Sequence, residues 1–153
     1  MHELLAAYPF TLTLRVAWGD MDAYQHVNNT IYFRYFESAR IAYMDHLAVA
    51  GFLSNRGIGP ILHSINCRFR LPVTYPDTVV IGTRVTEIGE DRFVMDHCLV
   101  SQQHQKIAAQ SEAIIVTYDY ERQRKAPIPA LVRERIEALE QTVGRTPQLM
   151  PQR

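Results

Sequence analysis

The sequence has only two cysteines, no long hydrophobic run and no excess of either charge. Cys67 and Cys98 stand alone inside strand-like segments, which favours packing thiols over a disulfide framework or a metal motif. Lys plus Arg and Asp plus Glu both number 16, whereas a nucleic-acid surface requires a basic excess. No apolar stretch reaches the roughly 18 residues of a membrane-spanning helix, and residues 1–10 lack the hydrophobic region and cleavage site of a signal peptide. We therefore expect a cytoplasmic protein that binds no nucleic acid and inserts into no membrane.

The hydrophobic content is high enough for a folded core. A chain of 153 residues with 47% hydrophobic side chains predicts one domain over residues 1–153. Its first periodic segment is "TLTLRVAW", in which apolar and polar residues alternate. Leu12, Leu14, Val16 and Trp18 fall on one face, a pattern typical of a half-buried strand.

From Thr30 the periodicity changes to that of a helix. Asn28 or Asn29 is suited to cap its start, and Gly51 to end it. The apolar face predicted for this helix comprises Tyr32, Tyr35, Phe36, Ala39, Tyr43 and Leu47.

Four further strands are predicted over residues 61–71, 78–88, 92–102 and 107–120. Short turns join them, so strands that are neighbours in sequence should pair antiparallel. A shorter helix is expected at about 129–141, followed by a frayed tail. The fold class is therefore α+β, and only the long helix can cover the apolar face of the sheet.

A polar loop, "DMDAYQHVNN" at residues 20–29, leads into the long helix. The first N–H groups of a helix are unpaired and carry partial positive charge, so they stabilise a carbonyl oxygen that becomes negative during nucleophilic attack. Asp22 can attack such a carbonyl or activate a water, and His26 can orient the substrate or assist proton transfer. This set of residues suits acyl hydrolysis.

The same residues also fit a structural role, because Asp and Asn before a helix commonly cap it. Asp20 fits that role better than Asp22, so no chemistry is assigned to Asp20. A metal site formed by His26, His63 and His97 is another alternative. These histidines show no short ligand spacing, so we predict no metal.

Residues 15–40, "RVAWGDMDAYQHVNNTIYFRYFESAR", resemble the signature of hotdog-fold acyl-CoA thioesterases of the 4-hydroxybenzoyl-CoA thioesterase type. In that family a strand leads to a D-x-D loop, often followed by HVNN, then Tyr and a long helix. The resemblance implies a hotdog fold over about residues 8–125, with a five-stranded antiparallel sheet wrapped around a long central helix. It also implies an acyl-CoA substrate, no separate cofactor, and a homodimer or homotetramer with active sites at the subunit interface.

The resemblance also assigns roles to residues of the loop. Asp22 matches the family's catalytic carboxylate, as nucleophile or as general base. Asn29 matches the residue whose backbone N–H faces the thioester oxygen, and His26 and Asn28 would line the acyl-thioester pocket. Plant-type acyl-carrier-protein thioesterases resemble this loop too, but they carry Asn where this chain has Tyr24.

A second thioesterase branch uses a Glu on the central helix instead of the loop Asp. Glu37 is the residue that could take this role here. Its alternative interpretation, which we favour, is an i, i+3 partner of Arg40.

Substrate-binding residues are predicted outside the loop as well. Arg68 and Arg70 end one strand, and Arg122, Arg124 and Lys125 follow the last. They fit either a rim for the phosphates of coenzyme A or an ordinary solvated surface.

The aromatic residues of the long helix fit either an acyl tunnel or a plain core. Tyr32 is the one that we assign to substrate binding. The HVNN motif favours a fatty or branched acyl group. The competing functions are an acyl-carrier-protein thioesterase, a hydroxyacyl-thioester dehydratase that uses His26 with Glu37, and a non-catalytic acyl-thioester binder.

Overall fold

Ten elements follow one another along residues 3–151, the part of the chain that the computed structural model describes. Their bounds are β1 Phe10–Arg15, η1 Trp18–Asp20, α1 Asn29–His46, β2 Ile58–Phe69, β3 Thr78–Ile88, β4 Arg92–Ser101, β5 Lys106–Asp119, β6 Arg124–Lys125, α2 Ala130–Gln141 and β7 Gln148–Leu149. All the predicted strands and both predicted helices are present. The bounds of β3 are those predicted from the sequence, whereas the other strands are shifted at one or both ends.

The strands form one sheet in the order β1-β3-β4-β5-β2, and every pair along this path is antiparallel. The predicted pairing of sequence neighbours is wrong for β2 and β3, because β2 pairs with β5 at the edge of the sheet and β1 lies beside β3. Two short strands join the sheet: β6 pairs antiparallel with β5, and β7 pairs parallel with β3. The sheet therefore has seven strands, two more than predicted. The prediction of a frayed tail is wrong for residues 148–150, since β7 lies beside β3 and the Met150 N–H donates to the Ile88 carbonyl at 2.8 Å.

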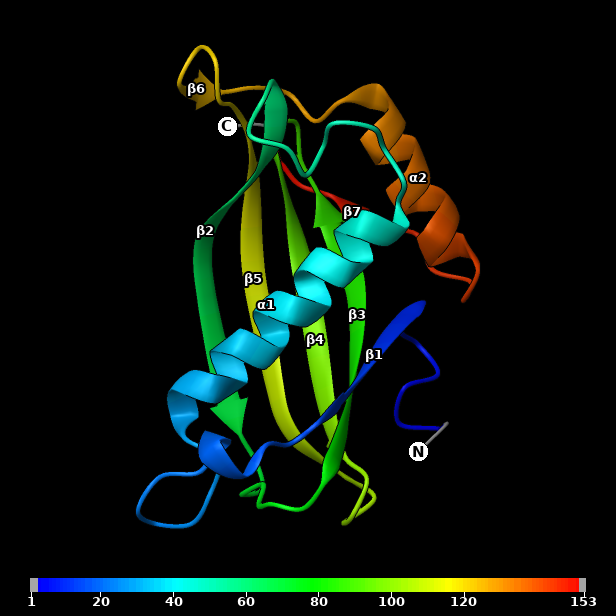
Figure 1. The fold of residues 1–153 in the computed structure, drawn as a ribbon. Helices are drawn as coiled ribbons and strands as arrows, with labels where there is room; N and C mark the ends of the chain where they lie inside the picture. The colour runs from blue at the N-terminus through cyan, green and yellow to red at the C-terminus, as the bar shows by residue number, and fades with distance from the viewer. Residues whose placement is uncertain (1–2, 152–153) are drawn as a thin grey trace.

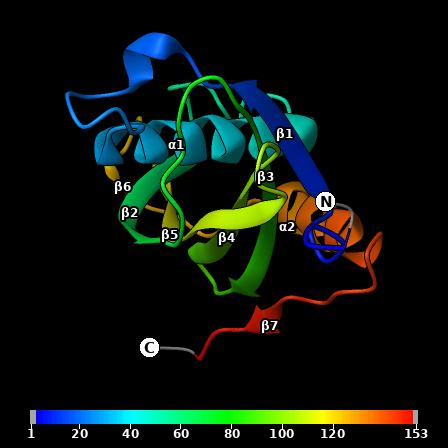
Figure 2. The ribbon, with the colours of Figure 1, turned by 90° about the horizontal axis from the view of Figure 1, so that it is seen from below.

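Helix α1 crosses one face of the sheet diagonally, and the C-terminal segment with β7 lies on the other side (Figures 1 and 2). The apolar face of α1 lies against the sheet, as the spacing of its hydrophobic residues predicted. Phe36 and Ala39 pack on Ile81 and Leu99, and Tyr43 packs on the other half of the core. This arrangement leaves the N-terminus of α1 near the end of β2 and beside the polar loop (Figure 1).

The two ends of α1 are set by different means. Asn28 is the N-cap, and its side chain accepts a hydrogen bond from the Thr30 N–H. At the other end the helix stops at His46, before the predicted Gly51. Ala48 turns the chain there with a positive φ of 56°, a conformation more usual for glycine.

Helix α2 is fastened to the core by a buried carboxylate. Glu140 accepts hydrogen bonds from the Tyr43 hydroxyl at 2.7 Å and from the Val85 N–H at 3.0 Å. Burial raises the pKa of this carboxyl above its usual range. One side chain thus joins α2 to both α1 and β3.

The face of the sheet away from α1 is partly covered by the chain before β1. Leu5 and Tyr8 pack over β3 and β4 together with Cys98 and Val100. A β-carbon on Gly82 would lie 2.7 Å from Tyr8 Cγ and 2.9 Å from Leu5 Cδ2. Position 82 therefore requires glycine because neighbouring side chains leave no room for a β-carbon, and not because of its backbone conformation.

Replacing Gly82 with alanine is expected to lower the free energy of unfolding by about 1–3 kcal/mol, the usual effect of overpacking. The added methyl must displace the ring of Tyr8, which outweighs the better strand propensity of alanine. Urea denaturation measures the change. Gly19→Ala is the matched control, because a β-carbon on Gly19 would have no atom within 4 Å. Equal stability of the two variants would contradict this account.

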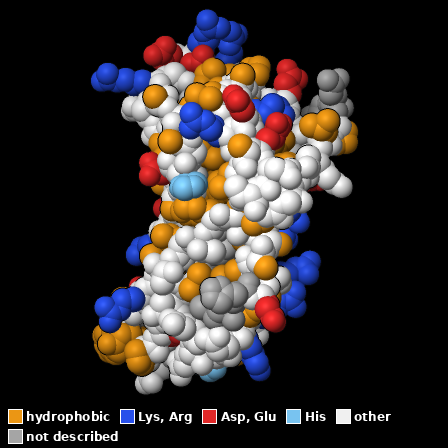
Figure 3. All heavy atoms as spheres, turned by 90° about the vertical axis from the view of Figure 1, so that its right-hand side faces the viewer, with side chains coloured by type: hydrophobic (Ala, Val, Ile, Leu, Met, Phe, Trp, Pro, Cys, Tyr) orange, Lys and Arg blue, Asp and Glu red, His pale blue; other side chains and the backbone are white. Residues whose placement is uncertain are grey.

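Among the described residues, the side that carries β1 and α2 has a surface of mixed character. Hydrophobic side chains lie there between charged groups of both signs (Figure 3). Within the described residues, neither helix is both long enough and apolar enough to cross a membrane.

Candidate active site

The loop between η1 and α1 is a closed turn held by backbone hydrogen bonds. Met21 and Val27 form an isolated antiparallel bridge, and the Asp22 N–H donates to the His26 carbonyl at 3.1 Å. Gln25 adopts a positive φ of 61° at the tip. Val27 is buried, and its N–H donates to the Val73 carbonyl at 2.8 Å. The turn therefore presents its polar side chains on a fixed frame.

The two aspartates of the loop have different surroundings. Asp20 Oδ2 accepts hydrogen bonds from the Ala17 N–H at 3.0 Å and from the Tyr35 hydroxyl at 2.6 Å. It thus ties η1 to α1, which agrees with the structural role predicted for it. Asp22 is exposed and bonded only within the loop and helix start.

Both oxygens of Asp22 accept hydrogen bonds. Oδ1 accepts from the Tyr24 N–H at 2.9 Å, and Oδ2 accepts from the Asn28 side-chain amide at 3.1 Å. The carboxylate is therefore held next to the residue that caps α1.

The N-terminus of α1 opens into a hollow of about 300 Å³. His26, Asn29, Tyr32 and Arg70 contribute to its wall, so the structure gathers four of the predicted site residues there. Phe69, the last residue of β2, closes one side and packs edge-on against Tyr32 with ring centroids 5.1 Å apart. Polar groups at a helix end beside aromatic walls suit an acyl compound with a carbonyl.

Asp22 borders a second hollow, of about 450 Å³, together with Trp18, Met21, Ala23 and Gln25. Trp18 was predicted on the buried face of a strand, and this prediction is wrong. Strand β1 ends at Arg15, and Trp18 lies in η1 with 72% of its surface exposed. The tryptophan thus belongs to the rim of the site and not to the core.

Tyr32 is positioned by the segment that follows β2. Its hydroxyl accepts a hydrogen bond from the Val73 N–H at 3.1 Å, and burial raises the pKa of the phenol. Since Val73 also binds the loop through Val27, one short segment holds both the loop and the first turns of α1.

The arginines predicted to bind phosphate are not gathered in one place. Arg70 borders the hollow at the helix start, and its Nε donates to Gln110 at 3.2 Å. Arg68 is the cross-strand partner of Gln110, so its side chain lies on the same face of the sheet as that of Arg70, but Arg68 does not contribute to the wall of the hollow. The structure does not bring Arg68 to the hollow, and its role in binding stays a prediction that its position does not support.

The basic residues after β5 lie at the other end of the molecule. Arg122, Arg124 and Lys125 belong to the β6 turn, remote in the same chain from the loop and the N-terminus of α1 (Figure 1). They cannot share a phosphate rim with Arg70 of their own subunit.

Glu37 is exposed on α1, two turns beyond the helix start. At 1.5 Å per residue it stands about 12 Å along the axis from Asn29. Its charge acts instead on Arg40, since it raises the pKa of a guanidinium that burial otherwise lowers. This agrees with the favoured interpretation and also separates Glu37 from His26, its proposed dehydratase partner.

The remaining aromatic residues of the helix belong to the core. Tyr35, Phe36 and Tyr43 are buried and have their own partners in the sheet, in the loop or in α2. Tyr24, by contrast, is exposed at the loop tip. No acyl tunnel needs to be assigned to these residues.

The histidines considered as metal ligands have separate locations. His97 is fully buried between the sheet and α1, His63 is exposed on β2, and His26 is in the loop. Over residues 3–151 no group of three His, Cys, Asp or Glu side chains is placed to hold a metal ion.

The cysteines are both free in the structure. Cys98 is buried and Cys67 is partly buried against the core. Burial raises the pKa of both thiols, to about 11 for Cys67. The interpretation as packing thiols agrees with these positions.

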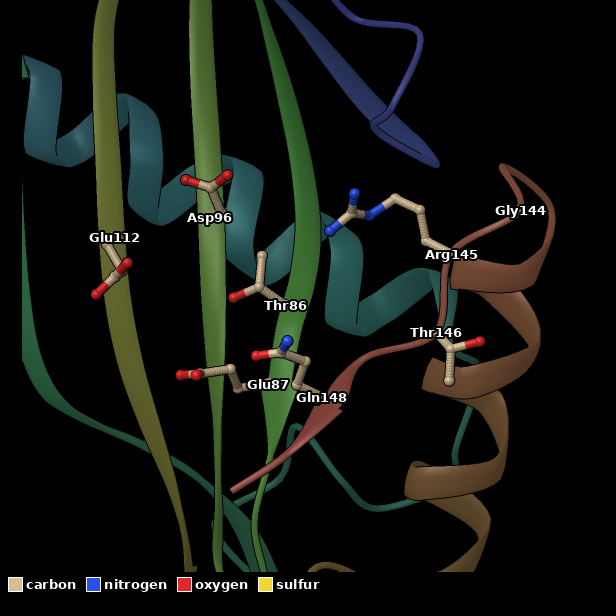
Figure 4. A pocket seen from close by; sticks show the side chains of 8 residues that line it. All are labelled: Thr86, Glu87, Asp96, Glu112, Gly144, Arg145, Thr146 and Gln148. Atoms are coloured by element: carbon tan, nitrogen blue, oxygen red, sulfur yellow. The ribbon is translucent and has the colours of Figure 1, made fainter. Parts of the chain in front are cut away.

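Another hollow lies away from the loop, on the face of the sheet opposite α1 (Figure 4). It measures about 560 Å³, and its wall includes Glu87, Asp96 and Glu112 together with Arg145. Asp96 is already paired with Arg84 at 2.8 Å. A polar, carboxylate-rich wall does not suit an acyl chain, so the helix start is the better candidate for the active site.

Asp22 is fixed beside the N-terminus of α1, and a hollow opens at that N-terminus. This arrangement is typical of proteins that act on a polarised carbonyl group. A sequence profile described as the thioesterase-like superfamily matches residues 16–136. The chain belongs to this superfamily, which confirms the resemblance seen in residues 15–40.

Three similar proteins support this assignment. The PA2801 protein of Pseudomonas aeruginosa is 31% identical, with a TM-score of 0.76 over 83% of this chain and 97% of its own. A thioesterase from Thermus thermophilus, solved with coenzyme A and zinc, is 28% identical, with a TM-score of 0.77 over 88% of this chain and 96% of its own. The long-chain acyl-CoA thioesterase FadM of Escherichia coli K12 is 21% identical over 126 residues, which are 82% of this chain and 96% of FadM.

Proposed function

We propose that this protein hydrolyses the thioester of a fatty or related acyl-CoA to the free acid and coenzyme A. The observation that carries the proposal is the Asp22 carboxylate, held 3.1 Å from the amide of the residue that caps α1. A nucleophile or base thus stands next to the N–H groups best able to stabilise an oxyanion.

Two routes use this placement. In one, Asp22 attacks the thioester carbon, the C–S bond breaks, coenzyme A leaves as the thiolate, and water cleaves the resulting anhydride. In the other, Asp22 takes a proton from a water that attacks the carbon directly, and the C–S bond then breaks with coenzyme A leaving as the thiolate. Both routes consume one water, and in both the Asn29 N–H faces the oxygen that becomes negative.

The thioester would lie at the start of α1, between the hollow that His26 and Asn29 border and the hollow that Asp22 borders. Arg70 is the residue in the wall of the first hollow that suits a phosphate, because a guanidinium can make paired hydrogen bonds to phosphate oxygens. His26 and Tyr32 would contact the thioester portion. Relatives that are acyl-CoA thioesterases or that bind coenzyme A support the choice of thioester.

We further propose a cytoplasmic homodimer or larger homo-oligomer. Strand β2 has β5 on one side and no other strand among residues 3–151, and it exposes Ile61, Leu62 and Phe69. Long edge strands with exposed apolar side chains favour pairing with another strand. Antiparallel pairing with β2 of a second copy would bring the partner's basic β6 turn toward the Phe69 end of this chain.

Release of free thiol from a panel of acyl-CoAs tests the activity. The panel runs from acetyl to palmitoyl and includes a benzoyl and a branched member. Turnover that peaks within one acyl class supports the proposal and gives the substrate range. A dehydratase would change the absorbance of an enoyl product without releasing thiol, and a binder would do neither. Thiol release only from acyl-carrier-protein thioesters would overturn the choice of coenzyme A.

A further inference from the structure

Asn28 takes part in two sets of hydrogen bonds through opposite ends of one side-chain amide. Its Oδ1 accepts from the Thr30 N–H at 2.9 Å and from the Thr30 hydroxyl at 2.7 Å. Its Nδ2 donates to Asp22 Oδ2 at 3.1 Å. The two donors of Thr30 fix which end of the amide is the oxygen, and so they direct the NH₂ group to Asp22.

The second oxygen of Asp22 is held from within the loop, by the Tyr24 N–H at 2.9 Å. The carboxylate is therefore oriented by two donors on two sides. Of these, only Asn28 connects it to α1. A capping role alone requires the Oδ1 contact and leaves the Nδ2 contact without a purpose.

We propose that Asn28 is a positioning residue, which fixes the Asp22 carboxylate in register with the first turn of α1. This inference rests on the proposed function of Asp22 and deepens it. The helix cap and the orientation of the reactive carboxylate depend on one amide, so the distance between attacking group and oxyanion site is set by a side chain that need not touch the substrate. Catalysis is sensitive to such placement.

Asn28→Asp separates the two roles with almost no change of shape. Asp is as good an N-cap as Asn, and its charge is favourable at a helix N-terminus. The oxygen that caps Thr30 is retained, whereas the donor to Asp22 is replaced by a second carboxylate oxygen. Two like charges at that distance disfavour ionisation of the pair.

We expect N28D to stay folded, because the charge at the helix N-terminus offsets part of the repulsion from Asp22, and to lose about 10- to 100-fold in kcat at neutral pH, with KM changed far less. The acid limb of its pH–rate profile should move to higher pH. N28S, which keeps a capping oxygen but cannot reach Asp22, should lose kcat with a smaller shift, because it removes a donor without adding a charge. A residue that only caps the helix would leave N28S, which keeps a capping oxygen, fully active, and that result would overturn the inference.

A second measurement is independent of turnover. The carboxyl ¹³C signal of Asp22, assigned with Asp22→Asn, is followed against pH in the wild type and in N28D. The Asp22 signal should titrate at higher pH in N28D, and identical titrations would overturn the inference. If the wild type releases no thiol while this shift is present, the proposed function fails and the coupling of Asn28 to Asp22 stands.

Discussion

Asp22→Asn is expected to lower kcat for acyl-CoA hydrolysis by about 10²-fold or more and to leave the fold intact. The amide can neither attack the thioester carbon nor accept a proton from water. Asp22 is exposed, and an amide oxygen can still accept the hydrogen bond from the Tyr24 N–H, so little stability is at stake. Thiol release under saturating substrate measures the effect, and circular dichroism confirms the fold.

Glu37→Gln is the matched control, because it makes the same chemical change on an exposed carboxylate. Glu37 lies on α1 but stands about 12 Å along the helix from Asn29 at 1.5 Å per residue. We expect near-normal turnover in this variant. The opposite pattern, with a folded and active Asp22→Asn protein and an inactive Glu37→Gln protein, would transfer the catalytic role to Glu37.

The main elements could be predicted because their periodicity is local. Alternation in β1 and the helical spacing of Tyr35, Phe36 and Tyr43 are set by which face is buried, and the structure confirms both. The polar loop could be predicted as a site because it combines Asp, His and Asn before a helix, and because residues 15–40 resemble a known family signature. The comparisons confirm the family, and the roles of Asp22 and Asn29 stay predictions that their position supports.

What was missed depends on contacts that periodicity does not encode. Strands β6 and β7 have two residues each, too few to show a pattern. Trp18 continued the alternation of β1, but Asp20 binds the Ala17 N–H and turns the chain into η1 before it. The contact between Asp22 and Asn28 depends on the turn around Gln25 and so could not be foreseen from spacing.

The core also contains a histidine whose environment predicts a large effect of pH. His97 is fully buried, its Nδ1 lies 2.9 Å from the Thr83 hydroxyl, and its ring stacks on Phe36. Burial, aided by the nearby charge of Arg40, lowers the pKa of His97 to about 3. The imidazole is therefore neutral in the folded protein, although it serves no proposed catalytic step.

A histidine with a lowered pKa makes the protein acid-labile. The unfolded chain binds a proton near the ordinary value of about 6.5, whereas the folded chain resists protonation. Between that value and about 3 the unfolded state holds more protons, so stability present above the window is lost as pH falls through it. The slope from this residue alone approaches about 1.4 kcal/mol per pH unit.

His97→Asn keeps an oxygen that can bond with Thr83 but removes the titration. We expect this variant to be less stable at neutral pH, because it leaves a cavity under Phe36, and to lose much less stability between pH 6 and pH 4 than the wild type. Urea denaturation at several pH values gives both slopes. His104→Asn, which alters an exposed loop histidine, should keep the wild-type slope. Parallel curves for the wild type and His97→Asn would show that His97 is not the group whose burial makes the fold sensitive to acid.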